Sequence, residues 1–195
     1  MEDFKMYFTE GWNHIMSSDA LDHQLFILSL AALFLWKDWR RVLVLVTAFT
    51  IGHSLTLALS VYDVIRFSIA WVEFLIPITI LLTALYDLRY LNISKIEGRN
   101  IQFNYIIALS FGLVHGMGFA NSIRQMLASD QTIGIPLLSF NIGLEVGQIV
   151  LILLILLIAQ LLVVNVKLPR KYWILLLSVI PLILSLRMAL ERIPF

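Results

Sequence analysis

The most constraining feature of this sequence is a series of long apolar stretches separated by short charged segments. An α-helix needs about 20 apolar residues to cross a hydrocarbon core of about 30 Å. Inside such a core the backbone polar groups must be hydrogen-bonded within the segment, which favours helices over open strands. We therefore expect an all-α, polytopic membrane bundle of about six transmembrane helices. They are predicted near residues 22–36, 42–60, 68–87, 102–122, 136–164 and 173–190.

Composition and charge narrow the class of protein further. Hydrophobic residues make up 60% of the chain and charged residues only 14%, which predicts a single transmembrane domain over residues 1–195, in contact with the lipid bilayer. The formal net charge is only +1 and no basic stripe is present, so we expect no nucleic-acid partner. The chain has no cysteine, which leaves nitrogen and oxygen ligands for any bound metal, with methionine as the only sulfur donor. A homo-oligomer is neither indicated nor excluded.

Lysine and arginine are unevenly distributed among the expected loops. Nine of the fourteen follow the first, third and fifth helices: Lys37, Arg40, Arg41, Arg89, Lys95, Arg99, Lys167, Arg170 and Lys171. Cytoplasmic loops are enriched in these residues, so we predict a protein of the cell (inner) membrane with both termini on the periplasmic or extracellular side. Residues 1–20 lack the basic start of a cleaved signal peptide. Apolar residues recur there at helical spacing, which predicts an amphipathic tail on the outer membrane surface, with a frayed tail as the alternative.

Polar residues gather at one depth of the predicted bundle. With a rise of about 1.5 Å per residue, all four histidines fall in the outer half, together with several carboxylates. The candidates for direct metal contact are His14, Asp22, His23, His53, Glu73, His115 and Glu145. The candidates for supporting these ligands are Asp19, Ser54, Asn141 and Gln148. Ionisable groups inside a membrane are costly unless they are paired, so this layer indicates a site.

Imidazole and carboxylate groups suit a divalent ion such as Ni, Co or Zn, and the sequence does not choose among the three. A cation would also relieve the repulsion between carboxylates held close together in a medium of low dielectric constant. A purely structural interpretation remains for single members of the set. A buried histidine is often only a hydrogen-bond partner. Asp22 is well placed to cap a helix N-terminus, and Asp19 suits a surface position.

Five short motifs resemble the HupE/UreJ family. They are GWNHI (11–15), DHQLF (22–26), AFTIGHS (48–54), FGLVHG (111–116) and FNIGLE (140–145). The motifs extend from the N-terminal tail through the fifth predicted helix and come in the order of the family. Members of this family are described as nickel or cobalt permeases connected with hydrogenase and urease maturation, so the resemblance implies metal uptake.

Three functions compete at this stage. The first is a divalent-metal permease, in which the outer cluster captures the ion and His53, His115 and Glu145 pass it inward. Beneath that layer the predicted helices carry almost no ionisable residue, so the path would need hydroxyls, backbone carbonyls or water. The second is a zinc-dependent intramembrane hydrolase that opens to the periplasmic side, with Glu73 or Glu145 as general base. The third is a metal-stabilised accessory protein. Transport is the favoured hypothesis.

Overall fold

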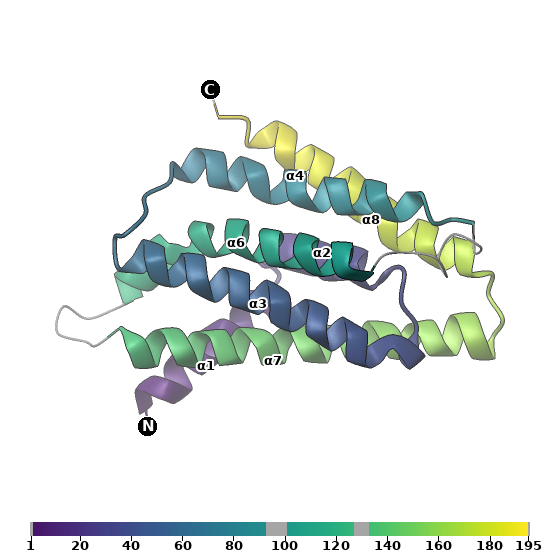
Figure 1. Cartoon of the computed structure of the whole chain (residues 1–195), viewed down its shortest axis with the longest axis horizontal. Helices are drawn as coiled ribbons and strands as arrows, with labels where there is room; N and C mark the ends of the chain where they lie inside the picture. The colour runs from purple at the N-terminus through teal and green to yellow at the C-terminus, as the bar shows by residue number, and fades with distance from the viewer. Residues whose placement is uncertain (1, 93–100, 127–132, 195) are drawn as a thin grey trace.

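The protein is a bundle of helices in the computed structural model, which describes residues 2–92, 101–126 and 133–194. Seven α-helices lie within these residues: α1 (Glu2–Met16), α2 (Leu21–Ala31), α3 (Trp39–Val61), α4 (Ile69–Leu88), α6 (Ile101–Met126), α7 (Gly134–Ala159) and α8 (Arg170–Glu191). The long helices run along one common direction, and both chain ends lie toward the same end of the bundle (Figure 1). The predicted all-α class is confirmed.

Four segments are long and apolar enough to cross a membrane. They are Trp36–Val61, Ile69–Leu88, Gly134–Asn165 and Arg170–Glu191. Leu21–Ala31 and Asn104–Phe119, within the described residues, are apolar but shorter. The structure thus gives four candidate spans, and the six that were predicted stay a prediction. So does the orientation, since two of the cations behind it, Lys95 and Arg99, lie outside the described residues.

The helix predicted near residues 22–36 ends earlier in the structure. α2 stops at Ala31, and Leu35 adopts an extended conformation before a short 3-10 turn, Trp36–Asp38. The Asp38 carboxylate accepts the backbone N–H of Leu35 at 3.3 Å, and the Asp38 N–H donates to the Leu35 carbonyl at 2.8 Å. These bonds begin the next helical segment, so the apolar residues before them form a turn. The 11-residue helix rises only about 16 Å, too short to cross a hydrocarbon core alone.

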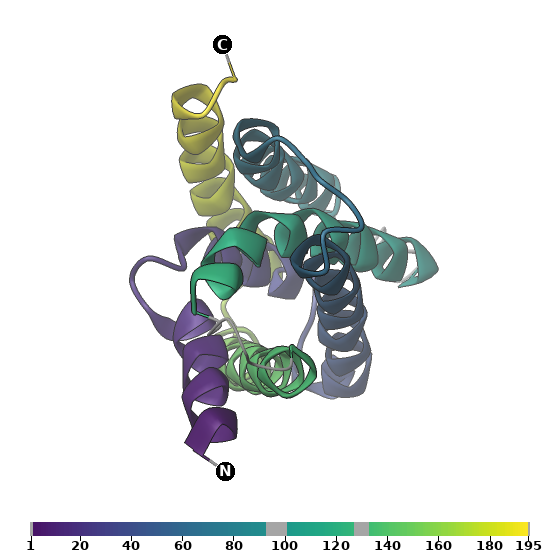
Figure 2. The same ribbon diagram turned by 90° about the vertical axis from the view of Figure 1, so that its left-hand side faces the viewer.

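The N-terminal segment is the helix α1, which packs along α7 (Figure 2). Its buried residues are Tyr7, Gly11 and Ile15, whereas Phe4, on the face predicted to be apolar, is 42% exposed. A Cβ atom at Gly11 would overlap the carbonyl oxygen of Phe140, so the absence of a side chain lets the two backbones touch. α1 runs inward from the end that holds the termini, and α2 continues beyond it, so the two helices lie in series (Figure 1).

The closest pair of long helices is α3 and α6, which run in the same direction (Figure 1). A Cβ at Gly112 would overlap the carbonyl oxygen of Phe49, and one at Gly116 would overlap that of His53. These glycines bring His53 on α3 close to the turn of α6 that carries His115. The packing of the two helices therefore places two of the four histidines at one depth.

Candidate metal centre

The break between α1 and α2 carries two histidines. His14 lies in the last turn of α1, and His23 lies in the first turn of α2. The side-chain amide of Gln24 donates to the carbonyl oxygens of Ile15 at 3.1 Å and Ser17 at 2.8 Å. Carbonyls at the end of a helix lack a partner within it, so Gln24 pairs the Ile15 carbonyl, whereas the Ser17 carbonyl also accepts the N–H of Ala20 at 3.2 Å. We refer to this pair of bonds as the Gln24 clamp.

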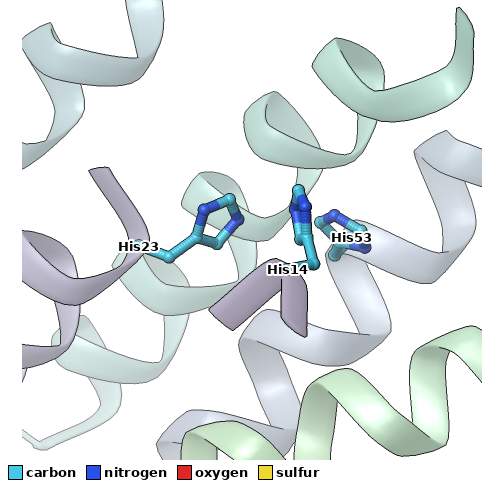
Figure 3. A group of neighbouring side chains, drawn as sticks. All are labelled: His14, His23 and His53. Carbon is cyan, nitrogen blue, oxygen red and sulfur yellow. The ribbon is translucent and has the colours of Figure 1, made fainter. Parts of the chain in front are cut away.

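Three imidazoles from three different helices meet at this break. Figure 3 shows His14 of α1, His23 of α2 and His53 of α3. Their ring centroids are 4.6 Å apart for His14 and His23, 6.2 Å for His14 and His53, and 6.4 Å for His23 and His53. Each ring offers one nitrogen such that these three atoms lie within 4.8 Å of one another. Zinc–nitrogen bonds of about 2.0–2.1 Å allow ligand nitrogens up to about 4 Å apart, so small side-chain rotations bring all three onto one ion.

A fourth imidazole and one carboxylate extend this group. The Nδ1 of His115 lies 3.4 Å from the Nε2 of His23, and the other nitrogen of His23 lies 2.9 Å from the Asp22 carboxylate. Asp22 also accepts the backbone N–H of His23 at 2.8 Å. A carboxylate on one ring nitrogen fixes the orientation of the ring and leaves the other nitrogen for a metal. In this geometry Asp22 holds His23 in place. The predicted capping role of Asp22 is wrong, because the N-cap of α2 is Ala20 and no side chain among the described residues caps this helix.

The unpaired nitrogen atoms show that the residues suit a metal. No described residue makes a hydrogen bond to the buried Nε2 of His14, His53 or His115. His53 is 0% exposed, and His23 and His115 are 4% and 2% exposed. Buried polar atoms in proteins usually have partners, and each exception requires an explanation such as a bound water or ion. An ion with a preference for imidazole could be held by these nitrogens.

Comparison with known families identifies the kind of protein to which this centre belongs. A family model described as "HupE / UreJ protein" matches residues 1–191, a range that includes every residue of the centre. The chain belongs to the HupE/UreJ family. No curated protein and no solved structure matches it. With its apolar helices, this HupE/UreJ protein is an integral membrane protein.

Two cavities adjoin the centre of this HupE/UreJ protein. The first, of about 250 Å³, is lined by His14, Asp22, His23, Glu73, His115 and Arg192, among others. The second, of about 350 Å³, is lined by Asp19, Asp22 and Arg192, among others. Glu73 is exposed and contributes to the wall of the first cavity rather than to the group of three histidines. Asp19 is exposed as well and lines only the second cavity, so both residues lie on the approach to the centre.

The remaining predicted residues lie on α3 and α7. The side-chain oxygen of Asn141 is 3.4 Å from the Nδ1 of His53, which matches the supporting role expected for Asn141. Glu145 does not join the group of three histidines, because its carboxylate accepts a hydrogen bond of 2.7 Å from Thr47. Gln148 accepts a bond of 3.1 Å from Thr50. Ser54 follows His53 on α3 and is half-buried.

Phenylalanine rings lie on both sides of the histidines. Phe26, Phe49 and Phe111 each lie about one helical turn from His23, His53 and His115, on the side away from the end that holds the termini. The ring of Phe26 is 5.1 Å from that of Phe49 and 5.0 Å from that of Phe111. We call these three rings the phenylalanine floor. On the other side, Phe119 and Phe140 lie 4.1 Å and 5.5 Å from His14.

Sequence reasoning did not single out Thr47, Thr50, Asp87 or Arg192. Asp87, near the opposite end of the bundle, is only 2% exposed and accepts a hydrogen bond of 3.1 Å from the buried Ser29. The half of the bundle away from the termini therefore contains an ionisable residue that the apolar pattern hid, because the pattern placed Asp87 at a helix end. The threonines carry a weak signal, since they lie three residues apart on α3, as Glu145 and Gln148 do on α7.

Proposed function

We propose that this HupE/UreJ protein is a permease for a divalent transition-metal ion of the nickel or cobalt type. The observation that carries the proposal is the convergence of His14, His23 and His53 at a break between two helices inside the bundle. Their nitrogens suit Ni, Co and Zn and bind calcium or magnesium poorly. Transporters often build ion sites where helices are discontinuous, since the interruption opens space and frees polar groups for the ion.

The surrounding residues then take distinct roles. The cavity lined by Glu73, Asp22 and Arg192 is the approach, where two carboxylates against one guanidinium give a net negative charge that attracts a cation. The three histidines bind the ion, and His115 supplies a fourth imidazole directly beside His23. Asp22 orients His23 through the bond to its Nδ1. The centre is built largely from neutral ligands, so it favours the ion by coordination more than by charge.

Family membership supports transport over catalysis, since the HupE/UreJ family is associated with nickel and cobalt transport and not with an enzyme activity. A zinc-dependent hydrolase would use the same imidazoles and keep one position open for water. A metal-stabilised accessory protein would retain the ion without moving it. These alternatives differ from a permease in what happens to the ion after it binds.

Binding and uptake measured on the same preparation test the proposal. The detergent-purified protein is titrated with Ni²⁺, Co²⁺ and Zn²⁺, bound metal is measured by elemental analysis, and uptake is followed in proteoliposomes. We expect about one ion per chain in the wild type and loss of both binding and uptake in His23→Ala. Ser178→Ala is the matched control, because Ser178 is buried on α8 and no described residue makes a hydrogen bond to its hydroxyl. Binding without uptake would favour the accessory protein or the enzyme, and wild-type protein that binds none of the ions would refute the proposal.

The orientation in the membrane belongs to the same proposal. We propose six crossings and both termini on the periplasmic or extracellular side, with α1 and α2 in series as the first crossing. The chain contains no cysteine, so single-cysteine variants report on topology directly. A membrane-impermeant maleimide applied to intact cells should label Asp3→Cys and should label Lys37→Cys only after permeabilisation. The reverse pattern would invert the orientation.

A further inference from the structure

Polar side chains join α3 to α7 on the inner side of the histidines. Thr50 donates a hydrogen bond of 3.1 Å to the side-chain oxygen of Gln148, and Thr47 donates one of 2.7 Å to the Glu145 carboxylate. At the outer end of this row, the Asn141 oxygen lies 3.4 Å from the Nδ1 of His53. We call Thr47, Thr50, Asn141, Glu145 and Gln148 the α3–α7 seam.

The seam begins at the metal centre and leads away from it. α3 runs toward the end that holds the termini, so Thr50 and Thr47 lie about 4.5 and 9 Å inward of His53. α7 runs in the opposite direction, so Glu145 and Gln148 lie about 6 and 10 Å inward of Asn141. Together they carry side-chain oxygens two helical turns deeper than His53.

The seam is also buried for most of its length. Gln148 is 1% exposed, Thr50 is 6% and Asn141 is 8%, whereas Glu145 is half-buried and Thr47 is exposed. Burying polar groups is costly unless they are paired. The three buried members are nonetheless polar, whereas most of the core is apolar, so this row places oxygen atoms inside the bundle.

The direct way inward from the histidines is apolar. The phenylalanine floor closes it, since Phe26 and Phe49 are at most 1% exposed and Phe111 is 7% exposed. Aromatic rings offer a divalent ion no lone pairs to replace the water that it loses. Among the described residues beside His53, the α3–α7 seam therefore provides the oxygen atoms that an ion needs to go deeper.

We propose that the α3–α7 seam is a second ion site of the permease, which takes the metal from His53 and passes it inward. This proposal rests on the proposed transport function. Its ligands are oxygen atoms of the Gln148 amide, the Glu145 carboxylate and the two threonine hydroxyls, which an ion contacts in place of the present hydrogen bonds. Nickel, cobalt and zinc bind oxygen ligands less tightly than imidazole, so the ion is held first strongly and then weakly. Conduction requires binding that is strong enough for entry and weak enough for release.

Variants that remove seam oxygens without touching the histidines test the second site. Gln148→Leu and Thr50→Val keep the size and lose the polar atoms. Thr83→Val is the matched control, because Thr83 is 5% exposed on α4 and its hydroxyl donates to the Thr79 carbonyl of the same helix at 3.0 Å. Each protein is measured for Co²⁺ binding, for the visible spectrum of bound Co²⁺, and for Co²⁺ and Ni²⁺ uptake into proteoliposomes.

We expect both seam variants to bind Co²⁺ with an unchanged spectrum and to transport about tenfold more slowly, while Thr83→Val behaves like the wild type. Retained binding with the same spectrum also shows that the variants fold. Uptake at the wild-type rate in both seam variants would overturn the second site and leave the permease intact. Metal binding without uptake in the wild type would instead overturn transport itself and the second site with it.

Discussion

The hydrogen bond between Asp22 and His23 provides the most direct test of how the centre is organised. In the structure the Asp22 carboxylate lies 2.9 Å from the Nδ1 of His23 and accepts the backbone N–H of the same residue. Removing such an orienting partner typically lowers metal affinity 10-fold to 100-fold. Asp22→Asn keeps one acceptor oxygen, so its loss of metal affinity should lie at the lower end of this range, about tenfold or 1.4 kcal/mol. Asp22→Ala removes both oxygens, so its loss of metal affinity should be near 100-fold, about 2.7 kcal/mol.

The assay is a titration of detergent-purified protein with Co²⁺, followed by the absorbance of the bound ion. Asp19→Asn is the control, because Asp19 is an exposed carboxylate that lines the neighbouring cavity and not the one beside the histidines. It should leave the affinity unchanged within about twofold, as expected for a solvent-exposed charge. If Asp22→Asn abolished binding as completely as His23→Ala, Asp22 would be a direct ligand. If even Asp22→Ala bound normally, the hydrogen bond would have no orienting role.

Two further substitutions test the packing around the centre. Gly112→Ala places a methyl group against the carbonyl oxygen of Phe49 and should destabilise the protein by about 1–3 kcal/mol or more, seen as a lower melting temperature in detergent. Gly134→Ala has no atom within 4 Å of the new methyl and should leave the melting temperature unchanged; equal effects at both glycines would contradict the close packing of α3 on α6. Gln24→Leu breaks the Gln24 clamp and should cost about 1–3 kcal/mol for the Ile15 carbonyl, which loses this bond. It should also weaken Co²⁺ binding, and a variant with normal stability and affinity would show that the clamp does not hold the break.

The apolar pattern predicted the helical class because hydrophobicity averaged over a long window does not depend on packing details. It predicted a boundary between a tail over residues 1–20 and a helix near 22–36, but it did not predict that α1 packs inside the bundle. Residues 1–20 contain enough polar side chains to suggest a surface segment, whereas in the structure Gly11 and Gly143 bring α1 and α7 into backbone contact. The apolar pattern also missed the end of α2 at Ala31. The turn that follows consists of apolar residues, which a hydropathy average cannot distinguish from a helix.

Depth along a helix was sufficient to group the histidines but not to place the carboxylates. His14, His23, His53 and His115 were predicted to share one layer, and the structure brings them together. Glu145 was predicted to share that layer, but in the structure it lies deeper, beside Thr47, because the packing of α7 against α3 decides which neighbour it meets. Such packing depends on the close glycine contacts between helices, which the sequence shows only as common small-residue pairs. The contact partners of Glu73 and Glu145 therefore required the structure.

The close packing of α3 on α6 fixes the separation of two of the four histidines. Gly112 and Gly116 of α6 lie directly against backbone carbonyls of α3, so the two helices cannot slide along each other without a steric clash. His53 and His115 therefore keep a fixed separation. His14 and His23 stand instead on two short helices joined by residues 17–20 and the Gln24 clamp. α1 packs against α7, while α2 packs mainly against α8 and α4. Of the helices that carry the four histidines, α2 alone makes no such glycine contact within the described residues, so residues 17–20 and the Gln24 clamp set the position of His23.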